Sequence, residues 1–430
     1  MPDQTDRTKG NYHPELELMK PAEREEYQSR RLREIVEHAY ANAPAMRDKF
    51  DQVGVKPKDI RALKDLERLP ITEKTELVDL QRKNPPFGGL VAVPLKELGR
   101  IFASPGPIYE PYELHLDDER WCQAFYAGGF RPGDIGQVTF SYHMVPFAMM
   151  LDDSLRKMGC LAVPTGVGNT ELQVEIMRDV GVNAYLGTPS FLKAMADKAE
   201  AMGLDLQKDI NLNVGFVAAE MLPETLRDQL EIRFGMLIRQ SYGTADVGCL
   251  GYECYQMTGM HWPDNVIVEV VDPETGKQLG PGEVGEVVAT VFNKTYPLVR
   301  FGSGDLSYYT DEPCPCGRTA NRLVKIVGRV DQVTKVKGMF IHPGQADELA
   351  RRFPAVDRYQ VVVTRAEHKD YLAFHAELAE EFPEKDRPAL REEMERAMPQ
   401  VLRLRGEVIF LPRGTLKGEY KKIDDRRTWE

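Results

Sequence analysis

Short β-forming runs and helical stretches alternate between residues 130 and 218, and this alternation constrains the fold more than any other feature of the sequence. Strands are expected at 137–141, 160–164, 184–187 and 214–218, with helices between them at 144–158, 170–180 and 189–202. Such alternation is typical of βαβ units, in which parallel strands form a sheet that helices cover. It predicts a large α/β domain.

The flanking segments have different patterns. Apolar residues at helical spacing occur within 14–53, and Leu69-Pro70-Ile71-Thr72-Glu73-Lys74 is typical of a turn into a helix that Thr72 caps. After residue 262, the runs 266–271 and 285–292 indicate antiparallel strands joined by tight turns. Beyond residue 328, a small α+β unit is indicated by strands at 359–364, 372–378 and 407–410 and helices at 345–353 and 387–398.

These patterns predict an α/β protein of two domains. The large N-terminal domain, 1–327, has helix-covered sheets and a β-rich section at about 262–327. The small C-terminal domain, 328–430, is an α+β unit that is expected to be mobile.

Composition narrows the class of protein. The chain of 430 residues carries a net charge of −11, whereas duplex binding usually requires a basic surface, so no nucleic-acid partner is expected. No apolar run approaches the roughly 20 residues that span a bilayer, and the polar segment 1–10 lacks the apolar core of a signal peptide. We therefore expect a cytoplasmic protein without a membrane partner. Its six cysteines should be reduced there, as free thiols or metal ligands.

Four segments occur in a fixed order along the chain. They are Ser241-Tyr242-Gly243-Thr244-Ala245-Asp246, Arg300-Phe301-Gly302-Ser303-Gly304-Asp305, Gly328-Arg329-Val330-Asp331 and Lys337-Gly338. Each is weak evidence alone, but together they resemble the core motifs of the AMP-forming acyl-CoA synthetases. Three further segments resemble the phenylacetate–CoA ligase branch: Leu69-Pro70-Ile71-Thr72, Thr188-Pro189-Ser190, and Glu253-Cys254 followed by Gly259-Met260-His261. The resemblance extends over nearly the whole chain.

The resemblance implies a two-step reaction that joins a carboxylic acid to coenzyme A. The carboxylate first attacks the α-phosphorus of ATP, which gives an acyl-adenylate and pyrophosphate, and the CoA thiol then displaces AMP. Adenylation requires Mg²⁺ and cationic or N–H groups that neutralise the phosphates. Thioester formation requires a channel for CoA, which family members form by swinging the C-terminal domain about a hinge. A homodimer is the usual assembly in this branch.

The resemblance also assigns roles to individual residues. Asp305 matches the carboxylate that accepts hydrogen bonds from ribose, Arg329 matches a residue at the ribose or phosphate, and Asp331 matches the hinge. Asp246 matches an acidic residue that helps to hold Mg²⁺, although the family usually has Glu there. The other nucleotide-binding matches are Ala219, Glu220, Tyr242, Gly243 and Thr244. Without the surrounding motifs, Asp305 and Arg329 are equally typical of exposed turns.

The phosphate loop departs from the family pattern Ser-Ser-Gly-Thr-Thr-Gly-Lys-Pro. The matching segment is Ser104-Pro105-Gly106-Pro107-Ile108-Tyr109-Glu110-Pro111. Pro105 and Pro107 lack the backbone N–H that would bind phosphate, and Glu110 places a negative charge where a positive one would meet it. A unit charge reversal at ~4 Å is worth about 4 kcal/mol at an intermediate effective dielectric. We therefore expect that this loop does not hold pyrophosphate in the usual way.

The C-terminal catalytic lysine is the second departure. Family members end in a Gly-Lys-x-x-Arg type segment whose lysine reaches the carboxylate and the α-phosphate, whereas the ungapped match here has Glu419 at that position. Lys417 and Lys421 are the candidates for a catalytic lysine, and the alternative is a solvated basic tail. The two departures leave a second hypothesis open. It is a non-adenylating relative that binds nucleotide or acyl-CoA and processes a thioester, or that supports a partner enzyme.

Cys314-Pro315-Cys316-Gly317-Arg318 predicts a tight turn that presents two thiols to a metal ion. With Cys254 and His261 upstream, the four ligands suit a closed tetrahedral zinc site with a structural role, and ligases of this branch resemble the chain in this pattern. The alternative is four unconnected residues with reduced cysteines. Cys249 is a spare candidate ligand, whereas Cys122 and Cys160 lie in apolar stretches that are typical of a core.

The resemblance places the acyl pocket beside the central sheet, with Tyr142, His143, Phe147 and Ala218 as candidates for its wall. A wall of this kind suits an aromatic or other apolar acid. The same residues are equally typical of a buried helix face. His143 has two further interpretations, as a general acid or base and as a core histidine.

Overall fold

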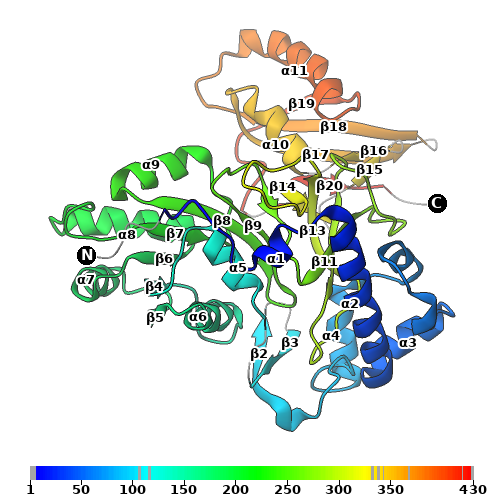
Figure 1. The fold of residues 1–430 in the computed structure, drawn as a ribbon. Coiled ribbons are helices and arrows are strands. Elements are labelled where there is room, and N and C mark those ends of the chain that lie inside the picture. The colour runs from blue at the N-terminus through cyan, green and yellow to red at the C-terminus, as the bar shows by residue number, and fades with distance from the viewer. Residues whose placement is uncertain are drawn as a thin grey trace. The chain divides into compact units, whose positions relative to one another are not determined.

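The computed structural model describes residues 6–104, 108–114, 118–330, 334–336, 339–341, 343–366, 369–418 and 420–427. The chain divides into two compact units (Figure 1). The large unit consists of Met1–Ser303 and Tyr308–Lys325, and the small unit consists of Gly304–Ser307 and Ile326–Glu430.

Five parallel strands form one half of the large sheet, in the order β5-β4-β6-β7-β8. They are Ile135–Val138 (β4), Leu161–Pro164 (β5), Ala184–Gly187 (β6), Val214–Val217 (β7) and Leu237–Thr244 (β8). The helices before and between them are Arg120–Ala127 (α5), Phe147–Lys157 (α6), Thr170–Val180 (α7), Pro189–Ala201 (α8) and Glu224–Phe234 (α9). The predicted alternation of strands and helices is therefore confirmed.

Helices cover both faces of this parallel half, because successive side chains of a strand point to opposite faces. In β6, Ala184 and Leu186 pack with residues of α5 and α6, whereas Tyr185 packs with residues of α7, α8 and α9. Every residue of β6 and β7 is buried. The parallel half is thus the middle layer of three, and its core is divided between its two faces.

The other half of the sheet continues from β8 in the order β9-β10-β14-β13-β12-β11. These strands are Gly248–Glu253 (β9), Met260–His261 (β10), Val266–Val271 (β11), Gly285–Val291 (β12), Phe301–Thr310 (β13) and Arg322–Arg329 (β14). The pairing of β11 with β12 is antiparallel, as the sequence predicts for the β-rich section. The pairings of β8 with β9, β9 with β10, and β10 with β14 are also antiparallel, although these were not predicted.

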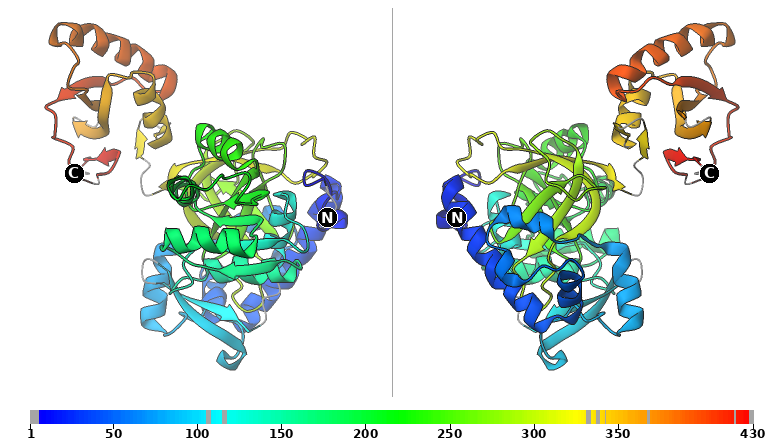
Figure 2. Two further views of the ribbon diagram at one scale, coloured as in Figure 1. Left: turned by 90° about the vertical axis from the view of Figure 1, so that its left-hand side faces the viewer. Right: turned by 90° about the vertical axis from the view of Figure 1, so that its right-hand side faces the viewer.

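Helices from the start of the chain pack on this β-rich half (Figure 2). They are Pro14–Glu17 (α1), Pro21–Asn42 (α2), Pro44–Gln52 (α3) and Lys74–Lys83 (α4), with short 3₁₀ turns at Pro57–Asp59, Leu63–Arg68 and Leu95–Glu97. Leu32 and Val36 of α2 share a buried cluster with Val268 and Val287 of the sheet. The single helical region predicted at 14–53 is therefore three helices, each of which begins with a proline at its first position.

Two details near the phosphate-loop segment differ from the prediction. The described residues of the segment belong to a hairpin of Leu98–Ser104 (β2) with Ile108–Glu113 (β3), for which no strands were predicted, whereas Pro105 and Pro107 lie outside the described residues. The prediction that Thr72 caps a helix is wrong, because α4 begins at Lys74 with Glu73 as its N-cap. Thr72 instead belongs to the short strand Thr72–Glu73 (β1), where its N–H donates to the Arg300 carbonyl at 2.7 Å.

The small unit contains a four-stranded sheet in the order β19-β18-β17-β20. Its strands and helices are Pro343–Arg351 (α10), Val356–Ala366 (β17), Lys369–Leu378 (β18), Arg387–Val401 (α11), Glu407–Leu411 (β19) and Ile423–Asp425 (β20), with a 3₁₀ turn at Glu384–Asp386 and the hairpin of Thr334–Val336 (β15) and Met339–Ile341 (β16). Both α helices bury apolar residues in one cluster with the sheet. Among the described residues, no helix combines the length and apolar character that a membrane span requires.

Candidate active site and metal centre

The carboxyl ends of the parallel strands bring together most of the predicted adenosine-side residues. Ala218, Ala219 and Glu220 directly follow β7, and Tyr242 to Thr244 end the adjacent strand β8. In open α/β sheets, ligands bind at this edge.

Ala219 has a φ of 66°, which lies in the left-handed region that non-glycine residues rarely adopt. The next residue, Glu220, accepts a hydrogen bond from the Ser190 hydroxyl at 2.8 Å, so the chain after β7 is tied to the start of α8. Backbone strain of this kind persists where surrounding contacts hold it, and it is commonly found at ligand sites.

Three of the four residues predicted for the acyl pocket lie together. Phe147 contacts the rings of Trp121 and Phe140, with centroid separations of 5.5 Å and 4.8 Å. Phe147 and Tyr142 both pack on the buried cluster that contains Ala218, and the Tyr142 hydroxyl donates to Asp152 at 2.9 Å. His143, by contrast, is exposed.

Asp246, the predicted magnesium ligand, forms an ion pair that sequence reasoning did not identify. Its Oδ2 atom lies 2.7 Å from Nζ of Lys74, the first residue of α4, and the Asp246 side chain is fully buried. The sequence contained a signal, because Lys74 lies two residues after the Leu69-Pro70-Ile71-Thr72 segment used for the resemblance. A cation of the N-terminal segment thus lies where the phosphate-loop lysine is missing.

Glu110 is buried close to the same ion pair, with 2% of its surface exposed. Burial and the nearby Asp246 raise the pKa of Glu110 from 4.5 to about 8, and it accepts a hydrogen bond from the Ser104 hydroxyl. Both residues line a cavity of about 50 Å³ with Trp121 and Tyr296. Within the described part of the chain, Glu110 Oε2, Asp246 Oδ1 and the Tyr296 hydroxyl have no hydrogen-bond partner. The residues around the cavity therefore include three buried polar atoms whose hydrogen-bonding capacity is not used.

The predicted ribose carboxylate is paired with the predicted ribose or phosphate residue. Arg329 Nη1 donates to Asp305 Oδ1 at 2.9 Å, and both residues belong to the small unit. Gly304 has a φ of +74°, and a Cβ atom there would lie 2.7 Å from Arg329 Nη2, so glycine leaves room for this pair. Asp331, the predicted hinge, lies outside the described residues.

The two candidate catalytic lysines lie in the segment that joins β19 to β20. Lys417 and Lys421 are both exposed, whereas Leu416 beside Lys417 is buried. Glu419 lies outside the described residues.

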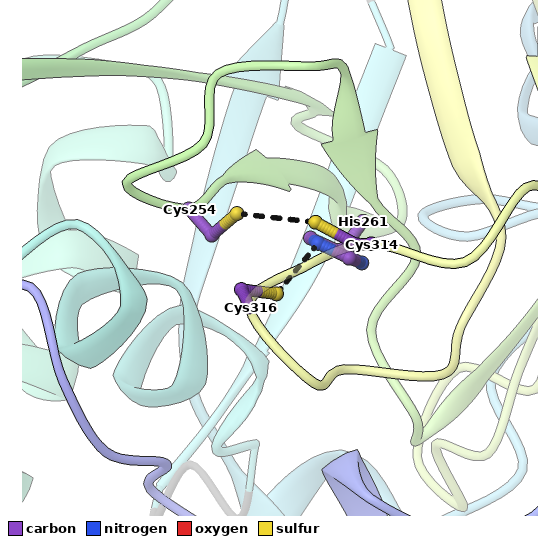
Figure 3. A group of neighbouring side chains, drawn as sticks. All are labelled: Cys254, His261, Cys314 and Cys316. Atoms are coloured by element: carbon purple, nitrogen blue, oxygen red, sulfur yellow. Dashed lines mark hydrogen bonds between the residues drawn. The ribbon is translucent and has the colours of Figure 1, made fainter.

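The predicted metal ligands converge in the large unit. The ligand atoms of Cys254, His261, Cys314 and Cys316 all lie within 4.8 Å of one another (Figure 3). Sγ of Cys254 is 3.8 Å from Sγ of Cys314, and Sγ of Cys316 is 3.4 Å from Nε2 of His261. Tetrahedral zinc with bonds of about 2.3 Å to sulfur requires sulfur atoms about 3.8 Å apart. Cys249 is buried elsewhere, beside Arg120, and Cys122 and Cys160 lie in the core.

The surroundings of the cluster also suit a metal. Nδ1 of His261 lies 3.3 Å from the Ala320 carbonyl, which fixes the ring so that Nε2 faces the sulfur atoms. Neighbouring Cys254 and Cys316 lower the pKa of Cys314, which favours the thiolate that metals bind.

The turn of Cys314 and Cys316 also holds the start of the chain. Arg318 donates to Glu17 of α1 at 2.7 Å, and both side chains are almost fully buried. Earlier in the same N-terminal segment, Arg7 pairs with Asp134 at 2.8 Å. The cysteine turn is thus a fixed point for elements that are distant in sequence.

Comparisons with known proteins identify the family. The profile described as AMP-binding enzyme matches residues 141–290, and the one described as AMP-binding enzyme C-terminal domain matches residues 338–427. The phenylacetate-coenzyme A ligase of Thermus thermophilus is 33% identical over 384 residues, which cover 86% of this chain and 85% of the relative. The phenylacetate-coenzyme A ligase of Aromatoleum evansii is 31% identical over 443 residues, which cover 97% of this chain and 98% of the relative.

A solved structure agrees with these relatives. An open conformation of 2-hydroxyisobutyryl-CoA ligase, in complex with 2-HIB-AMP and CoA, matches with a TM-score of 0.88 at 25% identity, covering 99% of this chain and 96% of the other. The chain therefore belongs to the adenylate-forming CoA ligases among the AMP-binding enzymes, and within them to the phenylacetate–CoA ligase-like branch. The predicted fold class and family resemblance are confirmed, and the use of ATP and CoA fits this family.

Proposed function

We propose that this protein is an AMP-forming acid–CoA ligase that converts an aromatic or other apolar carboxylic acid, ATP and CoA into an acyl-CoA, AMP and pyrophosphate. The observation that carries this proposal is the ion pair of Lys74 with Asp246 at 2.7 Å. It places a cation beside the phosphate-loop segment, whose own residues supply none. The family's need for positive charge at the phosphates is thereby met from a different element.

In this proposal, side chains of both strand ends and helices act in adenylation. The substrate carboxylate attacks the α-phosphorus of ATP, and pyrophosphate leaves with the bonding electrons. Lys74 turns from Asp246 to the departing phosphates. Asp246 would be the residue that holds Mg²⁺, which would supply further neutralisation of phosphate charge. Asp305 accepts the ribose hydroxyls once Arg329 turns to the phosphate. Ala219, Glu220, Tyr242, Gly243 and Thr244 line the adenosine site.

An apolar acid is supported by the aromatic surroundings of the acyl pocket. Phe147, Trp121 and Phe140 form a contiguous set of ring contacts beside Ala218. Such walls bind apolar groups through burial and need few polar contacts for orientation. Tyr142 packs on the same buried cluster, and His143 is exposed beside it in the sequence.

Zinc is the metal that the four-residue cluster fits best. Three thiolates and one imidazole nitrogen give zinc a closed coordination shell without a position for substrate, so the role is structural. We infer one zinc per chain, held by Cys254, His261, Cys314 and Cys316. The family also supports a homodimer, and the reduced cysteines support a cytoplasmic location.

The ligase proposal is tested by incubating the full chain with ATP, Mg²⁺, CoA and a panel of aryl and alkyl acids. We expect AMP and pyrophosphate to appear in equal amounts with acyl-CoA for at least one apolar acid. The second candidate, a non-adenylating relative, is favoured by the lack of a lysine in the phosphate-loop segment, where Glu110 occupies the position of the family's cation. That candidate predicts binding of CoA or acyl-CoA, seen as a rise in melting temperature, without AMP for any acid.

A further inference from the structure

The segment that carries Lys417 is anchored by a buried carboxylate of the neighbouring strand. Glu377, near the end of β18, is 1% exposed. Its Oε2 atom accepts a hydrogen bond from the N–H of Gly414 at 2.9 Å, and its Oε1 atom accepts one from the N–H of Leu416 at 2.5 Å. These bonds, with another from Thr415, keep the pKa of Glu377 below its usual range, so the side chain remains a carboxylate.

Leu416, directly before Lys417, is fixed at three points. Its N–H is bound by Glu377, its carbonyl accepts a hydrogen bond from Arg358 at 2.5 Å, and its side chain is buried. On the other side of Lys417, Gly418 adopts a φ of +63°, which a residue with a side chain rarely adopts. The backbone on both sides of Lys417 is therefore defined, while its ammonium remains exposed.

The second candidate, Lys421, has a different setting. Its carbonyl accepts a hydrogen bond from Gln360 at 2.9 Å, as part of the approach to β20. The adjacent Lys422 pairs with Asp347 at 2.6 Å. This stretch is therefore fixed as a continuation of the sheet, whereas the Lys417 stretch is a separate turn with its own buried anchor.

We propose that Glu377 is a positioning residue for adenylation, which fixes the turn at 414–416 so that Lys417 is the lysine that serves this half-reaction. The inference rests on the proposed ligase function and deepens it. A flexible lysine must lose backbone freedom each time it meets the α-phosphate, whereas a turn that is already ordered avoids that entropic cost. Three backbone N–H groups on one carboxylate provide this order.

The test separates the two half-reactions. Adenylation is measured as acid-dependent exchange between pyrophosphate and ATP, and thioester formation as acyl-CoA production from supplied acyl-adenylate and CoA. We expect Lys417→Ala to lower the exchange rate about 100-fold and Glu377→Gln to lower it about 10-fold. Both variants should form thioester from supplied acyl-adenylate within about twofold of the wild-type rate, because a positioned lysine acts only in the first half.

Glu380→Gln is the matched control, because Glu380 is exposed and pairs with the side chain of Arg413 in the same segment. Within the described residues it has no hydrogen bond with the backbone of the turn. If Glu377→Gln does not fold, Arg358→Gln removes the contact to the Leu416 carbonyl from an exposed position and should give the same selective loss. An equal loss in both half-reactions, or loss in Lys421→Ala with retention in Lys417→Ala, would overturn the proposal. A wild-type chain without exchange for any acid would instead overturn the proposed function itself.

Discussion

The burial of Glu110 changes the chemistry of the phosphate-loop segment. A carboxyl group in water would be ionised and would repel phosphate, but Glu110 is 2% exposed and lies close to the Asp246 carboxylate. Desolvation and like charge both favour the protonated form and raise the pKa of Glu110. The Ser104 hydroxyl and the Lys74 ammonium act in the opposite direction, but their effect is smaller. At neutral pH the loop thus carries a hydrogen-bond donor where the sequence predicted a negative charge.

The pH dependence of stability follows from this shift. The folded chain holds the Glu110 proton up to about pH 8, whereas the unfolded chain releases it near 4.5. The folded state therefore binds more protons in this window, and stability falls as pH rises from 4.5 to about 8, then stays level. Glu110→Gln mimics the protonated form. The difference between its melting temperature and that of the wild type should therefore shift in favour of the variant as pH rises across this window. A constant difference from pH 5 to pH 9 would contradict the assignment.

Lys74 is the residue whose loss should affect adenylation most directly. Replacement by methionine keeps the length of the side chain but removes the charge that neutralises the phosphates, and it leaves Asp246 buried without a counter-ion. We expect Lys74→Met to lower the pyrophosphate exchange rate about 100-fold. Lys83→Met is the control, because Lys83 ends the same helix and is exposed. Equal exchange rates in the two variants would remove Lys74 from the mechanism.

At the scale of elements, the metal cluster joins two loops of the sheet. Cys254 directly follows β9, His261 is the last residue of β10, and Cys314 and Cys316 lie between β13 and β14. Metal analysis of the purified chain should find about one zinc per chain, and its removal by a chelator should lower the melting temperature by at least about 5 °C. The Cys316→Ser variant should start lower and show no further chelator effect. Retention of the full melting temperature without zinc would contradict a structural role.

Element prediction succeeded where patterns are local. The buried strands β6 and β7 and the helix α7 lie within a residue or two of their expected positions, because burial on both faces and helical spacing are visible in a short window. The hairpin of β2 and β3 was not predicted, because these strands are defined by their pairing with each other, which composition does not indicate. Strand β20 was not predicted either, because it has only three residues and pairs with β17, which lies far upstream.

At the scale of the whole molecule, the candidate site was predictable where family motifs carry it. The four metal ligands were found from their types and order, and they converge as expected. Lys74 was not assigned, because its partner Asp246 is 172 residues away and no local pattern indicates that pairing. Glu377 was overlooked for a similar reason, since it serves the backbone of a turn that lies 37 residues further on.

The attachment of the first segment to the cysteine turn has a consequence for synthesis on the ribosome. Glu17 is synthesised before its buried counter-charge, Arg318, which follows 301 residues later. The nascent chain must therefore expose this carboxylate while the whole parallel half is being translated. The ion pair of Glu17 with Arg318 forms only after the cysteine turn has emerged, so truncated translation products that end before this turn lack that contact of helix α1.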